Sequence, residues 1–162
     1  WTVALARVSK EVHSFEPLAA SADLLRKNIE LNNLSNVTVY QNAVSRQAED
    51  LAISYEKSTN RAGTFLGAGD DIKAVTLDSA FPDKKVDFLK VDVEGMEYDV
   101  IMGGKKLIKR SRPIIHIEIN SRLSRWKALY IWFYLNSLGY TFSDHFIHRS
   151  TFNVLATPPK SK

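Results

Sequence analysis

Strand-like and helix-like patterns alternate along most of this 162-residue chain, and this alternation constrains the fold more than any other feature. Short apolar runs of strand length occupy residues 12–15, 37–40, 86–91 and 113–119. Patterns of helical period occupy residues 1–8, 21–31, 96–109 and 125–138. Such alternation predicts an α/β fold, a mostly parallel sheet with helices on both faces. Two final strands, near residues 140–143 and 152–156, are expected to form a terminal antiparallel pair.

The length and composition indicate one domain. The chain is 44% hydrophobic and 25% charged, so it has enough apolar material for one core. We assign residues 1–157 to a single domain and residues 158–162 to a disordered tail. Within the domain, the short strand-like pieces at 51–55, 63–66 and 74–77 predict an antiparallel insertion, or flap.

Composition also excludes several kinds of site. Without cysteine, the chain cannot form a disulfide, a cysteine-containing zinc site or a thiol nucleophile. His145 and His148 have a spacing that could hold a metal, but no acid or third ligand is near, so we predict no metal site. No apolar run approaches the ~20 residues of a membrane span and no signal peptide is recognisable. A cytoplasmic location without a membrane partner is therefore expected.

Acidic residues follow three of the predicted strands. Asp92 and Glu94 follow strand 86–91, Glu118 ends strand 113–119, and Glu16 follows strand 12–15. Parallel sheets bind ligands at the carboxyl ends of their strands, so these acids predict a polar cleft at one edge. Each acid could instead cap a helix or bond to a loop backbone, and the pattern alone leaves both alternatives open.

Several short segments carry a family resemblance. In chain order they are Phe15-Glu16-Pro17, Leu25 with Asn28-Ile29 and Leu31-Asn32, Asn42-Ala43-Val44, Lys90-Val91-Asp92-Val93-Glu94-Gly95-Met96-Glu97, Arg112-Pro113 and Ile117-Glu118-Ile119. Their order and spacing resemble the FkbM-type S-adenosylmethionine-dependent methyltransferases from the first residue to about Asn120. The Lys-x-Asp-x-Glu-Gly-x-Glu segment is the most specific of them. The resemblance implies a Rossmann-like class I methyltransferase fold.

The resemblance also implies an activity and a cofactor. It implies transfer of a methyl group from S-adenosylmethionine to a hydroxyl of a sugar or other small metabolite. Glu16 and Pro17 would border the cofactor's ribose, Asn42 and Ala43 its adenine, and Asp92 its methionine end or the reacting methyl group. Glu94 and Glu118, with Asp92, are the candidates for substrate binding or proton acceptance. His116 is a weaker candidate for the base, because a histidine on such a strand often packs in the core.

Two alternative functions are weighed against this one. A nucleic-acid methyltransferase is disfavoured, because the chain has no Asn-Pro-Pro-aromatic tetrapeptide and its densest basic cluster, residues 105–112, falls at the end of a predicted helix, where cations offset the helix dipole. A non-catalytic remnant of the fold is the other alternative. Nothing in the sequence indicates an oligomeric state.

The remnant hypothesis follows from one departure from the family. The family's catalytic domain begins with a strand and a glycine-rich loop that cradles the methionine part of the cofactor, whereas Trp1 falls in the helix after that loop. The missing strand belongs between strands 12–15 and 86–91. The chain could be a fragment, the sheet could close differently, or another segment could fill the gap. An unfilled gap would leave buried backbone groups unpaired, at about 1–3 kcal/mol each.

Overall fold

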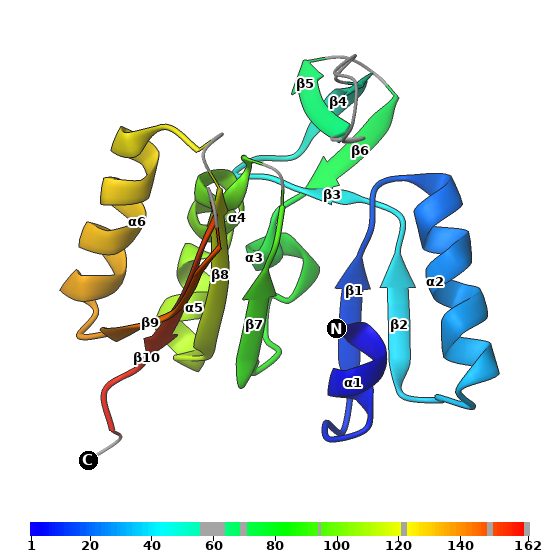
Figure 1. Cartoon of the computed structure of the whole chain (residues 1–162), viewed down its shortest axis with the longest axis horizontal. Helices are drawn as coiled ribbons and strands as arrows, with labels where there is room; N and C mark the ends of the chain where they lie inside the picture. Colours follow the sequence, from blue (N-terminus) through cyan, green and yellow to red (C-terminus); the bar gives the residue numbers. More distant parts are fainter. Residues whose placement is uncertain (56–63, 69–70, 94, 121–122, 149–150, 161–162) are drawn as a thin grey trace.

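Four parallel strands form the centre of the fold, in two separate pairs (Figure 1). The computed structural model describes residues 1–55, 64–68, 71–93, 95–120, 123–148 and 151–160. β1 (Val12–Phe15) pairs with β2 (Val37–Tyr40), Val12 lying opposite Val37. β7 (Phe88–Val91) pairs with β8 (Ile114–Asn120), Phe88 lying opposite Ile114. All four strands lie within two residues of their predicted limits.

The last two strands extend the second pair. β9 (Thr141–His148) and β10 (Thr151–Thr157) are antiparallel, and β10 lies beside β8, which gives the strand order β7-β8-β10-β9. The terminal antiparallel pair is therefore confirmed, and both strands are longer than predicted. Residues 161–162 of the expected tail lie outside the described residues.

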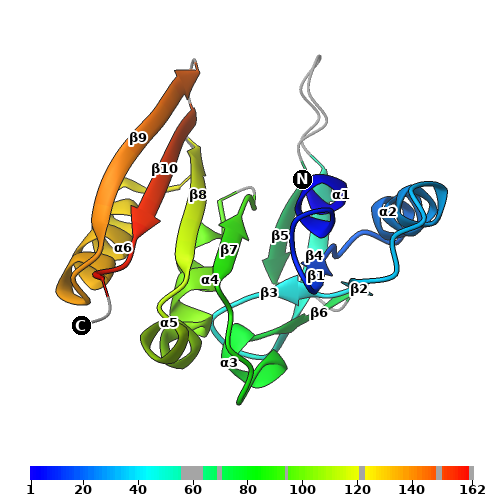
Figure 2. The same cartoon turned by 90° about the horizontal axis from the view of Figure 1, so that it is seen from below.

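Helices lie on both sides of these strands (Figure 2). α1 (Thr2–Ala6) and α2 (Ala19–Leu31) lie on one side. On the opposite side lie α3 (Leu77–Ala80), α4 (Glu97–Gly103) and α5 (Lys105–Ser111), and α6 (Arg125–Ser137) packs beside α4. The predicted helix 96–109 is divided at Gly104 into α4 and α5, and α3 was not predicted. Among the described residues, no helix has both the length and the apolar character needed to cross a membrane.

The main core lies between β8 and the helices α4, α5 and α6. Ile115 and Ile117 of β8 are fully buried against Ile101, Ile108 and Leu135, as the alternation along the strand predicts. The other face of β8 carries Ile114, His116 and Glu118, none of which is fully buried. The polar face of the strand is therefore turned away from the main core.

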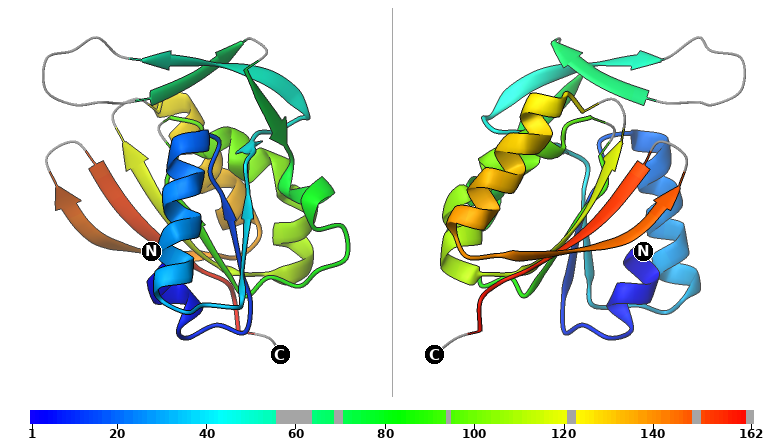
Figure 3. Two further views of the ribbon diagram at one scale, coloured as in Figure 1. Left: turned by 90° about the vertical axis from the view of Figure 1, so that its right-hand side faces the viewer. Right: turned by 60° about the vertical axis from the view of Figure 1, so that its left-hand side comes forward.

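The insertion forms a small sheet of its own above the carboxyl ends of the parallel strands (Figure 3). Its strands, in the order β3-β6-β4-β5, are β3 (Ala43–Val44), β6 (Ile72–Val75), β4 (Glu49–Tyr55) and β5 (Thr64–Ala68). The antiparallel flap was predicted, but β3, which runs parallel to β6, was not. Leu18 and Met96 pack under its apolar centre and attach the flap to the loops at the sheet edge.

β1 and β7 run side by side in the same direction, yet they do not pair (Figure 1). β1 pairs with β2, and β7 pairs with β8, and no described segment lies between them. This is where the family's first strand was expected. We call it the open strand position.

Candidate active site

The carboxyl ends of the parallel strands point to one edge, beneath the flap (Figure 1). Glu16 directly follows β1, Asp92 directly follows β7, and Glu118 lies in the second half of β8. Asn42 comes two residues after the end of β2. The structure thus brings these four predicted site residues to the same edge of the fold. Glu94 lies outside the described residues.

Glu16 stands at the rigid end of β1. Its backbone amide donates to the Tyr40 carbonyl at 3.0 Å, which continues the ladder between β1 and β2. Its Oε1 accepts a hydrogen bond from the Leu18 amide at 3.0 Å, across Pro17. The preceding residue, Phe15, stacks on Tyr40 with ring centroids 4.7 Å apart and packs against the core. The Glu16 carboxylate is therefore held by its own turn at the end of a well-packed strand.

Asn42 and Ala43 mark the start of the flap. The Asn42 side-chain amide donates to the Lys73 carbonyl at 3.1 Å, and Asn42 is half-buried. Ala43 is buried with Leu51 and Ile72 in the flap core and lies opposite Ala74 in the ladder. Packing accounts for the Ala43 side chain, so a role in bordering adenine would fall to its backbone and to Asn42.

Asp92 forms an ion pair with Lys90, a residue that the sequence analysis did not select. The two side chains are 2.8 Å apart, and the Lys90 side chain is only 10% exposed, whereas Asp92 is 47% exposed. The Lys90 ammonium also lies 5.1 Å from the ring centre of Trp1. Phe88, Lys90 and Asp92 share one face of the strand, so alternation could have revealed the pair.

His116 lies next to Lys90 on the neighbouring strand. The two residues are opposite each other in the β7–β8 ladder, and the His116 ring lies 5.5 Å from the ring of Trp1. His116 is half-buried under Trp1 on the face turned away from the main core. Glu118, one step further along the face, lies opposite Asn153 of β10. Lys90, Asp92, His116 and Glu118 thus form a polar stripe along the carboxyl halves of β7 and β8.

Glu97, the last residue of the 90–97 motif, is the second residue that the sequence analysis passed over. It is fully buried at the start of α4, and its Oε1 accepts the Gly95 amide at 3.2 Å. Gly95 has φ = 89°, a conformation that favours glycine. The buried carboxylate therefore holds the turn that carries the chain from Asp92 into α4.

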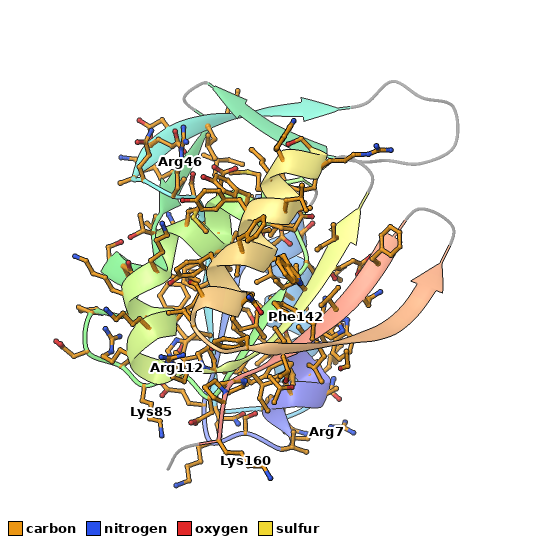
Figure 4. The ribbon with its side chains drawn as sticks, turned by 90° about the vertical axis from the view of Figure 1, so that its left-hand side faces the viewer. Arg7, Arg46, Lys85, Arg112, Phe142 and Lys160 are labelled. Carbon is orange, nitrogen blue, oxygen red and sulfur yellow. The ribbon has the colours of Figure 1, made fainter. Side chains whose placement is uncertain are left out.

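Asp99 joins three elements behind this turn. Its carboxylate lies 3.0 Å from Lys127 Nζ of α6 and 3.7 Å from Arg46 Nε, just after β3, and the Asp99 side chain is only 14% exposed. Figure 4 shows Arg46 where the flap meets the helices. The cluster links the flap to α4 and α6, and so helps to set the height of the flap above the sheet edge.

His13 of β1 gives folding a dependence on pH. Burial and the nearby Lys84 ammonium lower the pKa of His13 below its usual 6.5, although Glu11 partly opposes them. Because the folded state disfavours the protonated His13 ring, the neutral ring contributes fully to the stability of the fold at pH values above the pKa of His13 in the unfolded chain. This contribution is lost as the pH falls from there through the lower pKa of the folded state. We expect the melting temperature to fall between about pH 7.5 and about pH 5.5, and to fall less in His13→Phe. An equal fall in both proteins would contradict this assignment.

The comparisons with known proteins identify the family. The profile of the methyltransferase FkbM domain matches residues 1–142. The chain belongs to this family. Solved structures agree with it in fold: the methyltransferase FkbM from Methylobacillus flagellatus KT superposes with a TM-score of 0.60 at 19% identity, covering 91% of this chain and 36% of that chain. The family named from the sequence is thus confirmed, and this chain spans only about a third of that relative's length.

A second solved structure supports the same fold. Precorrin-6y C5,15-methyltransferase from Geobacter metallireducens GS-15 gives a TM-score of 0.53 at 10% identity and covers 98% of this chain and 86% of that chain. No curated protein matches the chain. The Rossmann-like class I methyltransferase fold expected for an FkbM domain is therefore confirmed.

Proposed function

We propose that this FkbM domain serves S-adenosylmethionine-dependent methylation of a hydroxyl group on a small molecule such as a sugar. The observation that carries the proposal is the gathering of Glu16, Asn42, Asp92 and Glu118 at one strand edge of an FkbM-family fold. Ligands of open α/β sheets bind at this edge.

The donor set fits the proposed cofactor. A carboxylate at a rigid strand end can accept hydrogen bonds from two neighbouring ribose hydroxyls, and Glu16, held at the end of β1 by the Leu18 amide, is such a group. Asn42 would supply an amide for a base edge, and Asp92 is the residue we assign to the methionine end. When bound, S-adenosylmethionine supplies an electrophilic methyl group on a sulfonium.

The chain's own residues would align the acceptor and remove its proton. Positioning of the acceptor hydroxyl can supply several kcal/mol of the barrier. The Asp92 carboxylate forms an ion pair with Lys90, so we assign Asp92 to orienting the reacting groups. Glu118, on the same polar stripe, is then the better candidate to accept the hydroxyl proton, with Glu94 as the alternative.

Removing the Glu16 carboxylate, the proposed acceptor of hydrogen bonds from the ribose, tests the proposal. In the protein expressed from its complete coding sequence, Glu16→Ala should weaken S-adenosylmethionine binding about tenfold to a hundredfold, since a hydrogen bond to a charged group contributes about 1.5–3 kcal/mol. Calorimetric titration measures the affinity. Asp23→Ala, which removes an exposed acid of α2, is the matched control and should leave it unchanged. Equal affinities for Glu16→Ala and the unaltered protein would remove Glu16 from the site.

The open strand position favours a second candidate, a non-catalytic remnant of the fold. One measurement distinguishes the two candidates, namely methyl transfer from S-adenosylmethionine to a panel of hydroxylated acceptors. The assay is carried out with the 162-residue chain and with the product of the complete coding sequence. We expect turnover from the latter and little or none from the former. No turnover and no cofactor binding by either protein would favour the remnant.

A further inference from the structure

The helix α6 has two apolar faces, and the fold covers only one of them. Ile131 and Leu135 are fully buried in the main core. A second set of large apolar residues recurs at the spacing i, i+3, i+4 and i+7, which places its members on one other face of the helix. These residues, which we call the outer stripe, are Trp126, Leu129, Tyr130 and Phe133. They are between 48% and 82% exposed, so core packing does not account for them.

The outer stripe lies on the outermost element of its side of the fold (Figures 1 and 4). Its rings are held by their neighbours: Tyr130 contacts Tyr98 of α4 edge to face, with ring centroids 5.6 Å apart, and Phe133 contacts Trp132 at 5.1 Å. Trp132, which is 45% exposed, stacks in turn on Phe142 of β9 at 6.1 Å. The stripe is therefore a fixed aromatic surface that continues toward β9.

Cations border this surface, and its two helices carry no acid. α5 contains four lysine or arginine residues and α6 contains two, whereas neither helix contains aspartate or glutamate. The Lys105 ammonium of α5 lies 5.7 Å from the ring centre of Tyr130 and 5.2 Å from that of Tyr134. The Tyr134 hydroxyl donates to the Lys105 carbonyl at 3.1 Å. The positive charges of α5 thus lie along the edge of the outer stripe.

Most of these cations have no internal partner. Lys127 is paired with Asp99 at 3.0 Å, and the Arg110 guanidinium donates to the carbonyls of Phe81 and Lys84. The other four side chains are exposed, and none forms an ion pair with any acid in the described part of the chain. These four, which we call the flanking cations, are Lys105, Lys106, Lys109 and Arg125.

We propose that the outer stripe and the flanking cations dock on the surface of a membrane that contains anionic lipids, with α6 lying along that surface. Helices that bind membrane surfaces combine an aromatic and aliphatic face with lysine and arginine beside it. Tryptophan and tyrosine favour the headgroup level, and cations attract anionic headgroups. The sequence-based expectation of no membrane partner considered spanning segments, whereas this surface would lie on a bilayer without crossing it.

The charges favour a lipid surface over a second copy of the chain. A symmetric dimer places the same patch of both protomers at the interface. Because α5 and α6 carry no acid, a dimer formed through the outer stripe would bring only further cations to the flanking cations. An anionic bilayer supplies the opposite charge.

Vesicle sedimentation tests the proposal with the product of the complete coding sequence. Binding to vesicles of phosphatidylcholine mixed with phosphatidylglycerol should be at least about tenfold tighter than binding to phosphatidylcholine alone, and salt should weaken it. The double variant Trp126→Ser/Phe133→Ser should bind the mixed vesicles at least about tenfold more weakly, because it removes two inserting rings. Lys109→Glu should weaken binding at least about fivefold.

Matched changes on α2 are the controls. Leu24→Ser/Leu31→Ser removes two exposed apolar side chains, and Lys27→Glu makes the same change of charge as Lys109→Glu. Both should bind as the unaltered protein does. Since all the altered side chains are exposed, each variant should keep the melting temperature to within about 3 °C.

Any of three results would overturn the proposal. The first is equal binding, or no binding, to the two kinds of vesicle. The second is the same loss of binding in the α2 variants as in the α6 and α5 variants. The third is a dimeric mass that Trp126→Ser/Phe133→Ser converts to a monomeric one, which would mean that a second copy covers the outer stripe. These measurements need neither S-adenosylmethionine nor an acceptor, so their outcome is independent of the proposed methyl transfer.

Discussion

Replacing Gly103 with alanine should destabilise the protein by about 3 kcal/mol or more, or about 6–12 °C in melting temperature. Gly103 ends α4, where the helix touches the segment between β3 and β4. A Cβ there would meet the Ser45 carbonyl oxygen and would lie 3.0 Å from its carbonyl carbon and 3.2 Å from Arg46 Cα. These are backbone atoms, so the flap would have to move away from α4. Thermal unfolding of Gly103→Ala measures the effect.

The neighbouring glycine supplies the control. A Cβ on Gly104 would lie 3.0 Å from Cδ1 of Leu77, an atom at the end of a side chain that can shift, and 3.3 Å from its Cβ, a milder contact than the one at Gly103. Gly104→Ala should therefore cost less than about 1.5 kcal/mol. Alanine ordinarily stabilises a helix interior relative to glycine by about 1 kcal/mol, so a loss of stability in Gly103→Ala, at a position inside α4, reports the backbone contact and not helix propensity. Equal stability of the two variants would show that α4 and the flap do not pack as described.

The second effect is expected from Asp92→Asn, which should cost about 1–2 kcal/mol, more than the ~0–1 kcal/mol of a surface pair and less than a fully buried pair, because Asp92 is 47% exposed. The Lys90 side chain is only 10% exposed, so the substitution removes the anion from a cation that is held close to the sheet. The ring of Trp1 would be its nearest remaining favourable contact. Chemical denaturation of the variant and of the unaltered protein gives the difference in free energy of unfolding.

Replacing Lys90, the other partner of the ion pair, should destabilise the protein less than replacing Asp92. Lys90→Met retains an unbranched apolar chain of similar length, and Asp92, which is 47% exposed, remains hydrated. We expect a cost below about 1 kcal/mol. A larger loss from Lys90→Met than from Asp92→Asn would mean that the buried amine is needed for another contact, and that the pair does not set the stability of this edge.

Some of these features are encoded in short stretches of the sequence, and others are not. The strands Val12–Phe15 and Val37–Tyr40 and the inward-facing Ile115 and Ile117 follow from a period of two, which any short window contains. The same alternation places Lys90 on the face of the strand that carries Asp92. Its burial, however, involves Trp1, which lies 89 positions earlier in the chain. Ala43 was assigned to the cofactor from a family motif, whereas its side chain packs in the flap.

The alternation of strands and helices, the acids at the strand ends and the motif of the FkbM family can be found in the amino-acid sequence, because each depends on neighbouring residues. The pairing of β3 with β6, the ion pair of Asp92 with Lys90 under Trp1, and the absence of pairing between β1 and β7 are seen only in the folded protein. These features depend on contacts between residues distant in the chain, and a strand edge carries no local mark of its partner.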